Sequence, residues 1–173
     1  MKKSIVLDLD GVIADTDSSI SDYLHYDCGV DEDYSKWLLS NTKDPEAIKL
    51  FSNPIFWKNI KPFEDAWHKC NEWFSNGIDI YIVTARKNEA LVATEKWLNE
   101  WNIGYNKIYY SDFGKKNEII QDINPMFVVE DNFKEIKILQ KSGVKCYLRK
   151  AWYNEKYWTT LDSVDSLYDI RLD

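Results

Sequence analysis

The sequence predicts an α/β fold: a Rossmann-like, doubly wound parallel sheet of about five strands, with a small helical cap inserted after the first strand. Short apolar runs rich in β-branched residues alternate with longer amphipathic stretches, which is typical of parallel strands joined by right-handed crossover helices. Polar residues follow most of these runs, as expected where ligands bind beyond the carboxyl ends of strands. A chain of 173 residues suits one such domain with a small lobe, so we expect residues 1–15 and 63–173 to form the core and residues 16–62 the cap.

The first predicted strand is the apolar run Ile5–Leu7, and the stretch DLDGVIAD follows it directly. Asp8 and Asp10 have one residue between them, so both are expected near the carboxyl end of the strand. Two ionised carboxylates this close repel each other and lose water on burial, and the usual remedy is a bound cation or a raised pKa. Gly11 fits a turn with positive φ or a close approach of the backbone to a ligand. A hard divalent metal is therefore our first hypothesis.

Residues 16–62 are expected to be helical, because their apolar residues recur at helical spacing between turn signals. Short helices are predicted there around residues 20–24, 37–39 and 47–51. Aromatic rings of this segment are candidates for stacking on a flat substrate group, since a ring face accepts any nucleobase. The rings in question are Tyr26, Trp37, Phe56 and Trp57, and packing in the core is the alternative for each of them.

The rest of the chain alternates helices and strands, with turn signals between them. Asn76-Gly77, for example, is typical of the end of a helix. Helices are predicted over residues 63–76, 88–101, 117–123 and 133–141, strands over 78–83, 107–110, 126–129 and 144–148, and a last helix over 162–168.

Chemically active side chains follow four of the predicted strands. They are Asp8 and Asp10 after the first, Thr84 at the end of the second, Lys115 and Lys116 after the third, and Glu130 and Asp131 at the end of the fourth. Each has an ordinary structural explanation by itself, because threonines cap helices, lysines at a helix start are solvated, and an Asp-Asn turn commonly leaves a sheet. Together, a hydroxyl, an ammonium and two acid pairs at successive strand ends suit phosphoryl transfer, with Mg²⁺ held by carboxylate oxygens.

These residues occur in the order of the four motifs of the haloacid dehalogenase superfamily of phosphatases, and DLDGVIAD resembles its first motif, D-x-D-x-[TV]. The resemblance implies that Asp8 is the nucleophile that forms an aspartyl-phosphate, and that Asp10 is the general acid and base. Asp8 and Asp131, with the backbone carbonyl of Asp10, could hold Mg²⁺, and Glu130 could act on it through a water. Thr84 and a lysine would bind the remaining phosphate oxygens.

The closer likeness is to the 5'(3')-deoxyribonucleotidase branch of that superfamily, including its bacterial and phage-type nucleotidases. The stretches that carry this likeness are DLDGVIAD, FWKNIKPFEDA, IVTARKNEALVATEKWL, VVEDN and AWYN. The resemblance to the superfamily as a whole spans the chain from residue 4 to about residue 154. In that branch a basic residue beside the second motif helps to hold phosphate, which makes Arg86, after Ala85, a further phosphate-binding candidate. Two departures leave the base preference open: KPFEDA lacks a glycine, and Thr16 stands where relatives carry an aromatic residue.

Lys115 and Lys116 are alternatives for the phosphate-binding lysine. The helix phase that turns Ile119, Ile120 and Ile123 inward leaves Lys116 in the first turn. We therefore prefer Lys116.

Composition argues against several classes of protein. The net charge of −7 and a pI of about 4.9 disfavour binding of a nucleic-acid duplex through a basic surface. Three widely spaced cysteines show no metal-binding pattern and indicate a reducing compartment, and the apolar run near the N-terminus is too short for a signal peptide or a membrane span. We expect a cytoplasmic protein without membrane contact, and a homodimer through exposed aromatic residues is a hypothesis.

The expected function is Mg²⁺-dependent hydrolysis of small nucleotides, above all deoxynucleoside 5'- or 3'-monophosphates. The alternatives are a phosphatase of the same superfamily acting on a sugar phosphate or a nucleic-acid 3'-phosphate, and a non-catalytic binding domain that retains the fold. A dinucleotide oxidoreductase, a P-loop kinase and an EF-hand protein are not expected, because their glycine or ligand patterns are missing. A dehalogenase would need no metal, so the acid pair favours phosphate.

Overall fold

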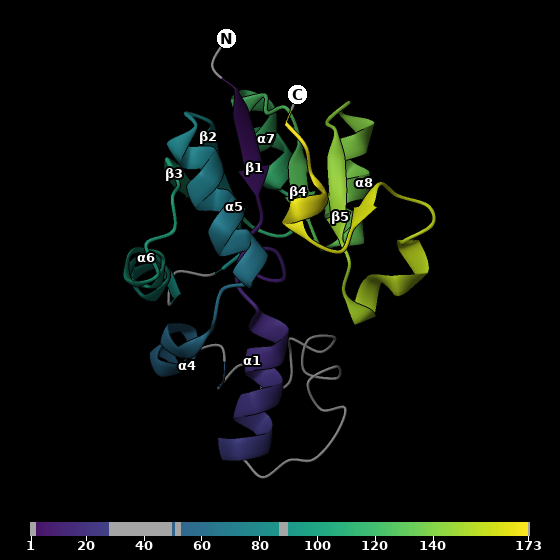
Figure 1. Ribbon diagram of the computed structural model, residues 1–173. Helices are drawn as coiled ribbons and strands as arrows, with labels where there is room; N and C mark the ends of the chain where they lie inside the picture. Colours follow the sequence, from purple (N-terminus) through teal and green to yellow (C-terminus); the bar gives the residue numbers. More distant parts are fainter. Residues whose placement is uncertain (1–2, 28–49, 51–52, 87–89, 173) are drawn as a thin grey trace.

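The computed structural model describes residues 3–27, 50, 53–86 and 90–172, and a parallel sheet forms its centre (Figure 1). Its six strands are β1 (Ser4–Leu7), β2 (Asp79–Thr84), β3 (Lys107–Tyr110), β4 (Val128–Glu130), β5 (Cys146–Arg149) and β6 (Ser163–Val164). They lie in the order β3-β2-β1-β4-β5-β6, so the winding reverses at β1. The carboxyl end of β1 is therefore at the switch point where ligands bind in such sheets. This is the predicted α/β, doubly wound fold.

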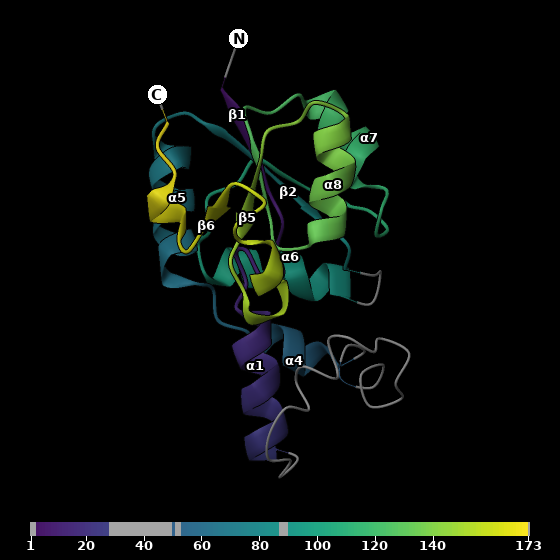
Figure 2. The same ribbon diagram turned by 90° about the vertical axis from the view of Figure 1, so that its right-hand side faces the viewer.

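Helices cover both faces of this sheet (Figure 2). On one face the core includes α5 (Glu64–Ser75) and α6 (Leu91–Glu100), and on the other face α7 (Lys116–Ile123) and α8 (Phe133–Lys141). Ile5 and Leu7 belong to the first layer with Trp73 of α5, whereas Val6 belongs to the second with Ile136 of α8. Successive side chains of a strand point to opposite faces, so a strand covered on both faces needs an unbroken apolar run.

The cap lies beyond the carboxyl end of β1 (Figure 1). Its described elements are α1 (Thr16–Asp22), a π-helical turn (Tyr23–Asp27) and α4 (Pro54–Asn59). The two segments that join cap and core are hydrogen-bonded to each other: the Asp15 N–H donates to the Lys61 carbonyl at 2.8 Å, and the Phe63 N–H donates to the Ile13 carbonyl at 2.9 Å. The chain thus leaves and re-enters the core at one place. The helix predicted at residues 37–39 and most of that at 47–51 lie outside the described residues.

A sixth strand, β6, extends the sheet beyond the five that the sequence predicts. It pairs in parallel with β5. The Leu148 N–H donates to the Asp162 carbonyl at 2.8 Å, and the Lys150 N–H donates to the Val164 carbonyl at 2.9 Å. A two-residue strand has too short an apolar pattern to be recognised in the sequence, and it forms here because the edge of β5 offers it hydrogen-bonding partners.

The helix predicted over residues 162–168 is wrong. β6 occupies its first half, and a short 3₁₀ helix, Leu167–Asp169, follows. Asp65 of α5 accepts hydrogen bonds from the Ser166 hydroxyl at 3.0 Å and from the Leu167 N–H at 2.6 Å. These tertiary contacts favour an extended backbone at Ser166 over a helix. The other core helices lie where they were predicted, although residues 87–89 ahead of α6 are not described.

Candidate active site

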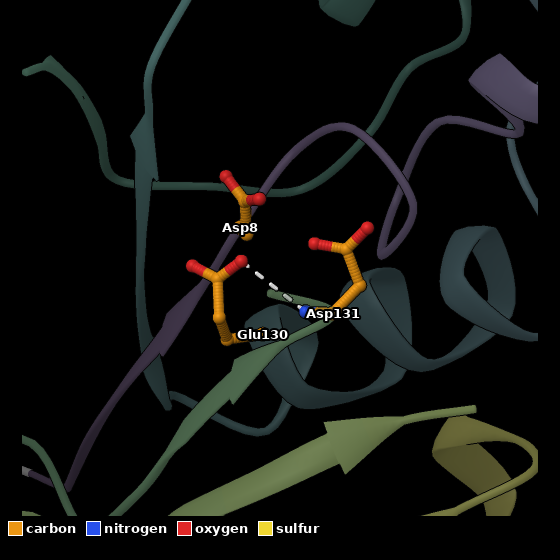
Figure 3. A group of neighbouring side chains, drawn as sticks. All are labelled: Asp8, Glu130 and Asp131. Atoms are coloured by element: carbon orange, nitrogen blue, oxygen red, sulfur yellow. Dashed lines mark hydrogen bonds between the residues drawn. The ribbon is translucent and has the colours of Figure 1, made fainter. Parts of the chain in front are cut away.

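The end of β1 places Asp8 next to Glu130. β1 and β4 are paired with Leu7 opposite Val129, and the Asp8 N–H donates to the Val129 carbonyl at 2.9 Å. One oxygen atom from each of Asp8, Glu130 and Asp131 lies within 4.8 Å of the other two. Figure 3 shows the three side chains around a common space, with one Asp131 oxygen directed toward the other two carboxylates. Two adjacent strand ends thus bring together acids that are far apart in the sequence.

Lys116 is the first residue of α7, and its ammonium group lies inside this acidic cluster. Its Nζ is 2.8 Å from Asp8 Oδ1 and 2.8 Å from Glu130 Oε2, and its side chain is only 1% exposed. The side chain of Lys115 is 73% exposed and pairs with Asp112. Burial lowers the pKa of Lys116, but the two carboxylates outweigh this and hold its pKa above the ordinary value. Lys116 is therefore a fixed cation against Asp8, and Lys115 is not brought to the site.

Glu130 uses both of its carboxylate oxygens. Oε2 accepts from Lys116, and Oε1 accepts from the backbone N–H groups of Asp131 at 3.2 Å and Asn132 at 3.1 Å. The sequence predicts that Glu130 acts on a metal through a water; in the structure its direct contact is with the lysine. Its first effect is therefore to hold Lys116 in place.

The pKa values of the three acids are all raised. Burial raises the pKa of Asp8 well above its ordinary value, and the charge of Glu130 raises it further against the opposing effect of Lys116. Burial also raises the pKa of Glu130 to about 7 and, with the charge of Asp8, that of Asp131 to about 6. A divalent cation would relieve this repulsion, and carboxylate oxygens are the hard ligands that Mg²⁺ prefers. The donor set fits such an ion.

Asp10 has a different set of partners. Arg86 donates to it twice, from Nε to Oδ2 at 2.8 Å and from Nη2 to Oδ1 at 2.6 Å. The hydroxyl of Thr16, the first residue of α1, donates to Oδ1 at 2.5 Å. Burial raises the pKa of Asp10, but the Arg86 guanidinium and the Thr16 hydroxyl outweigh it, so its pKa is lowered. Asp10 is an ionised carboxylate held by a bidentate arginine.

Arg86 also connects the site to the cap. Its Nη1 donates to the Thr94 hydroxyl at 2.9 Å, and its guanidinium lies 4.3 Å from the ring centre of Trp57 in α4. Thr84, the last residue of β2, is buried, and its hydroxyl accepts the Arg86 N–H at 3.2 Å. Ala85 lies between them in the chain. Of the predicted phosphate-binding residues, Thr84, Ala85 and Arg86 therefore lie at the end of β2, beside β1, and Lys116 lies at the start of α7. The roles of all of them stay predictions.

Tyr153 contacts the acidic cluster but is not among the site residues predicted from the sequence. Its hydroxyl donates to Asp131 Oδ2. Gly11 has the positive φ that was predicted, +76°, and a Cβ on it would collide with the Asp131 carboxylate and lie 2.8 Å from the Tyr153 hydroxyl oxygen. The close approach at Gly11 is thus to these two side chains. The one sequence signal for Tyr153 is its place in the AWYN stretch that carries part of the family resemblance.

The predicted cap rings lie in different surroundings. Tyr26 is 78% exposed, Phe56 and Trp57 are buried, and Trp37 lies outside the described residues. Tyr26 and Phe56 contribute to a cavity of about 400 Å³ between α1 and α4. The cavity is lined by Ser19, Asp22, Tyr23, Tyr26, Asn53, Ile55, Phe56, Asn59 and Lys61. Trp57 is not among its lining residues and packs against Arg86. Stacking of any of these rings on a substrate stays a prediction.

Comparison with known proteins bears on the fold of the chain. No protein-family model matches the chain. A nucleotidase of Clostridium acetobutylicum is 28% identical over 82 residues, which span 47% of this chain and 43% of the nucleotidase. Among solved structures, a phosphatase candidate from Clostridium difficile aligns with a TM-score of 0.68 at 19% identity over 99% of both chains. A HAD-superfamily hydrolase from Ehrlichia chaffeensis aligns with a TM-score of 0.55 at 16% identity, over 98% of this chain and 95% of the hydrolase. The chain therefore has the fold seen in HAD-superfamily hydrolases.

Among the described residues, no helix combines the length and the apolar composition that crossing a bilayer requires.

Proposed function

We propose that this protein is a Mg²⁺-dependent phosphomonoesterase that hydrolyses small nucleotides through an aspartyl-phosphate on Asp8. The observation that carries the proposal is the environment of Asp8 at the switch point of the sheet. Lys116 lies 2.8 Å from its Oδ1, and Glu130 and Asp131 complete a cluster of oxygens within 4.8 Å of one another. A metal cation and a lysine beside the carboxylate reduce the repulsion between an anionic phosphate and an anionic nucleophile, so that the phosphate can approach.

Asp8 and Asp131, with the backbone carbonyl of Asp10, are the groups that would hold Mg²⁺. When bound, such an ion would neutralise charge on the carboxylates and on the phosphate, as metal ions do in phosphoryl transfer. Lys116 remains as a second, permanent cation that Glu130 holds against Asp8. Thr84 supplies a hydroxyl donor at the neighbouring strand end.

The proposed reaction has two displacements at phosphorus. In the first, a carboxylate oxygen of Asp8 bonds to phosphorus while the ester P–O bond breaks, and Asp10 gives a proton to the leaving oxygen. In the second, water attacks phosphorus, Asp10 takes its proton, and the bond between Asp8 and phosphorus breaks. Inorganic phosphate leaves, and both carboxyl groups return to their starting states.

Arg86 gives the proposed reaction an order of events. While Arg86 binds both oxygens of Asp10, it holds the pKa of Asp10 low, and Asp10 has no proton to give. An arriving phosphate dianion is a competing partner for the guanidinium. Transfer of Arg86 from Asp10 to the phosphate would allow Asp10 to take up the proton that the leaving group needs.

A nucleotide is the proposed substrate for two reasons. The sequence match to a nucleotidase, although it covers 43% of that protein, is to a protein with this activity by name. The cap also offers the cavity between α1 and α4, with the exposed ring of Tyr26 on its lining. Aromatic faces of this kind bind nucleobases by stacking.

The test is phosphate release from a panel of deoxynucleoside and ribonucleoside monophosphates, sugar phosphates and a 3'-phosphorylated oligonucleotide. We expect turnover of nucleoside monophosphates in Mg²⁺, none in EDTA, and a loss of at least roughly 1,000-fold in Asp8→Asn. Asp122→Asn, at an exposed position of α7, is the matched control and should keep full activity. Unchanged turnover in EDTA or in Asp8→Asn would refute the proposal, and a preference for sugar phosphates or the oligonucleotide would refute its substrate class.

A further inference from the structure

The segment Trp152–Asn154, which follows β5, contacts both the cap and the acidic cluster, and we call it the bridging segment. It forms the start of a 3₁₀ helix, Trp152–Tyr157. Each of its three side chains makes a hydrogen bond to a different place: the cap, the carboxylate of Asp131, and the backbone next to that carboxylate. None of these contacts is used by the reaction proposed above.

The central residue, Tyr153, binds Asp131 directly. Its hydroxyl donates to Asp131 Oδ2. Burial and the charge of Asp131 raise the pKa of Tyr153, so the hydroxyl keeps its proton and remains a donor. The backbone of Gly11 lies close to the same oxygen, since a Cβ on Gly11 would collide with it. With Oδ2 enclosed in this way, the other oxygen of Asp131 is left for a metal, and Figure 3 shows one Asp131 oxygen directed toward Asp8 and Glu130.

Asn154 anchors the bridging segment to the core. It is buried, and its Nδ2 donates to the backbone carbonyls of Asp131 and Arg149, each at 2.9 Å. Its Oδ1 accepts from the Ala151 N–H at 3.0 Å and from Trp158 Nε1 at 2.6 Å. Four bonds on one amide fix the position of the chain, and with it the position of the Tyr153 hydroxyl.

Trp152 connects the bridging segment to the cap. Its indole N–H donates to Asp17 Oδ2 in the first turn of α1. Thr16, which precedes Asp17 in that turn, donates from its hydroxyl to Asp10. The start of α1 is thus hydrogen-bonded both to the proposed general acid and, through Trp152 and Tyr153, to the Asp131 carboxylate.

We propose that Tyr153 is a positioning residue for the metal ligand Asp131, and that the Trp152–Asp17 contact makes the affinity for the metal depend on the position of cap helix α1. This inference rests on the proposed function, because it takes Asp131 as a ligand of Mg²⁺. Groups that orient a ligand from behind are worth about 10- to 100-fold in metal affinity. Loss of the Tyr153 hydroxyl leaves Asp131 free to rotate, so part of the binding free energy is lost in ordering it again.

The experiment is calorimetric titration of the full chain with Mg²⁺ in the absence of substrate. Tyr153→Phe removes only the hydroxyl, and we expect Mg²⁺ affinity to fall by about tenfold. Trp152→Phe removes the indole N–H, and we expect a smaller fall, of about threefold. Tyr157→Phe is the matched control. Tyr157 lies in the same 3₁₀ helix, and its ring stacks on that of Phe133 with 3.5 Å between the ring centres. This variant should bind Mg²⁺ as the parent does.

The outcomes separate the two proposals. If the parent binds Mg²⁺ and Tyr153→Phe binds it within twofold, the positioning role is refuted while the proposed function stands. If Tyr153→Phe loses affinity but Trp152→Phe equals the parent, the dependence on the cap is refuted. If the parent itself binds no Mg²⁺, the metal in the proposed function is refuted. Far-ultraviolet circular dichroism of each variant at the titration temperature establishes that the folded protein is compared.

Discussion

Asp8 and Asp10 are separated by one residue, yet the two are held by different halves of the molecule. Asp8 lies among strand ends and core helices, with Lys116 against it and two further acids around it. Asp10 is bound by Arg86, which packs on Trp57 of the cap, and by Thr16, which begins the first cap helix. We refer to these as the core half and the cap half of the site.

The pKa values of the two aspartates move in opposite directions, and the difference shows what each half lacks. The pKa of Asp8 is raised, although the proposed nucleophile has to be ionised, and the pKa of Asp10 is lowered, although the proposed general acid has to be protonated. A cation bound beside Asp8 lowers its pKa, and a phosphate that draws Arg86 away raises that of Asp10. In this account the core half is completed by the metal, and the cap half by the substrate.

The largest expected effect comes from removing the cation of the core half. Lys116→Met leaves the buried carboxylates of Asp8 and Glu130 without their partner, and breaking such a pair costs about 3 to 5 kcal/mol. We expect that loss in urea unfolding, together with a roughly 100- to 1,000-fold fall in kcat. Lys115→Met changes the exposed neighbour and should alter the unfolding free energy by less than about 0.5 kcal/mol. Equal effects of the two substitutions would mean that Lys116 has no special role.

Arg86→Lys tests the cap half. Lysine keeps the charge but loses the two-point contact with Asp10 and the stacking on Trp57, so kcat/KM is expected to fall by roughly 10- to 100-fold. Thr94→Val removes only the hydroxyl partner of the Arg86 Nη1 group, and it should cost less than Arg86→Lys. Steady-state kinetics with a nucleoside monophosphate measure both. If Arg86→Lys has the same kcat/KM as the parent, the two-point contact of Arg86 with Asp10 is not needed for turnover.

Thermal unfolding at different pH values tests the acids of the core half. The ordinary pKa values of Asp131 and Glu130, 3.8 and 4.5, are raised in the fold to about 6 and about 7. As the pH rises through this range the unfolded chain releases protons first, so the free energy of unfolding falls between about pH 4 and pH 7. In EDTA we expect the Tm to drop by roughly 5 °C from pH 5 to pH 8, and by less in Mg²⁺.

Asp131→Asn should reduce this dependence on pH, because it removes one of the groups with a raised pKa. The exposed control Asp122→Asn should keep it. A Tm in EDTA that is constant or rises from pH 5 to pH 8 would show that the acids of the core half do not repel one another as described.

The smallest effect is expected at the cap cavity. Tyr26→Ala removes an exposed ring from the lining of this cavity. We expect KM for a nucleoside monophosphate to rise about fivefold, which corresponds to the lower end of the binding free energy that one base gains by stacking on an aromatic ring. KM for glycerol phosphate, which has no base, should not change. Tyr168→Ala serves as the control, because Tyr168 is also exposed but does not line the cavity. A rise in KM for both substrates would place the effect outside base recognition.

The sequence predicted the core half better than the cap half, for a physical reason. The core half depends on strand ends, and an apolar run that ends in a polar residue marks both the strand and the residue at its end. β1 and β4 were recognisable in this way, and their pairing alone brings Asp8 to Glu130. Helix phase was enough to distinguish buried Lys116 from exposed Lys115.

The contacts of the cap half and of the C-terminal segment depend on side-chain directions that no period in the sequence records. Arg86 was recognised as a basic residue beside the second motif, but not its two bonds to Asp10. Tyr153 reaches Asp131 from an irregular segment, and β6 is too short to leave a pattern. Both depend on tertiary contacts, that of Tyr153 with Asp131 and that of β6 with β5.

Trapping the covalent intermediate tests whether Asp8 is the nucleophile. The protein is mixed with a nucleoside monophosphate and Mg²⁺, quenched in acid within the first turnover, digested, and examined by mass spectrometry. The account predicts one phosphoryl group on the peptide that contains Asp8, removable by hydroxylamine as an acyl phosphate should be, and absent from Asp8→Asn. A phosphoryl group on another residue, or turnover with no label on the Asp8 peptide, would contradict it.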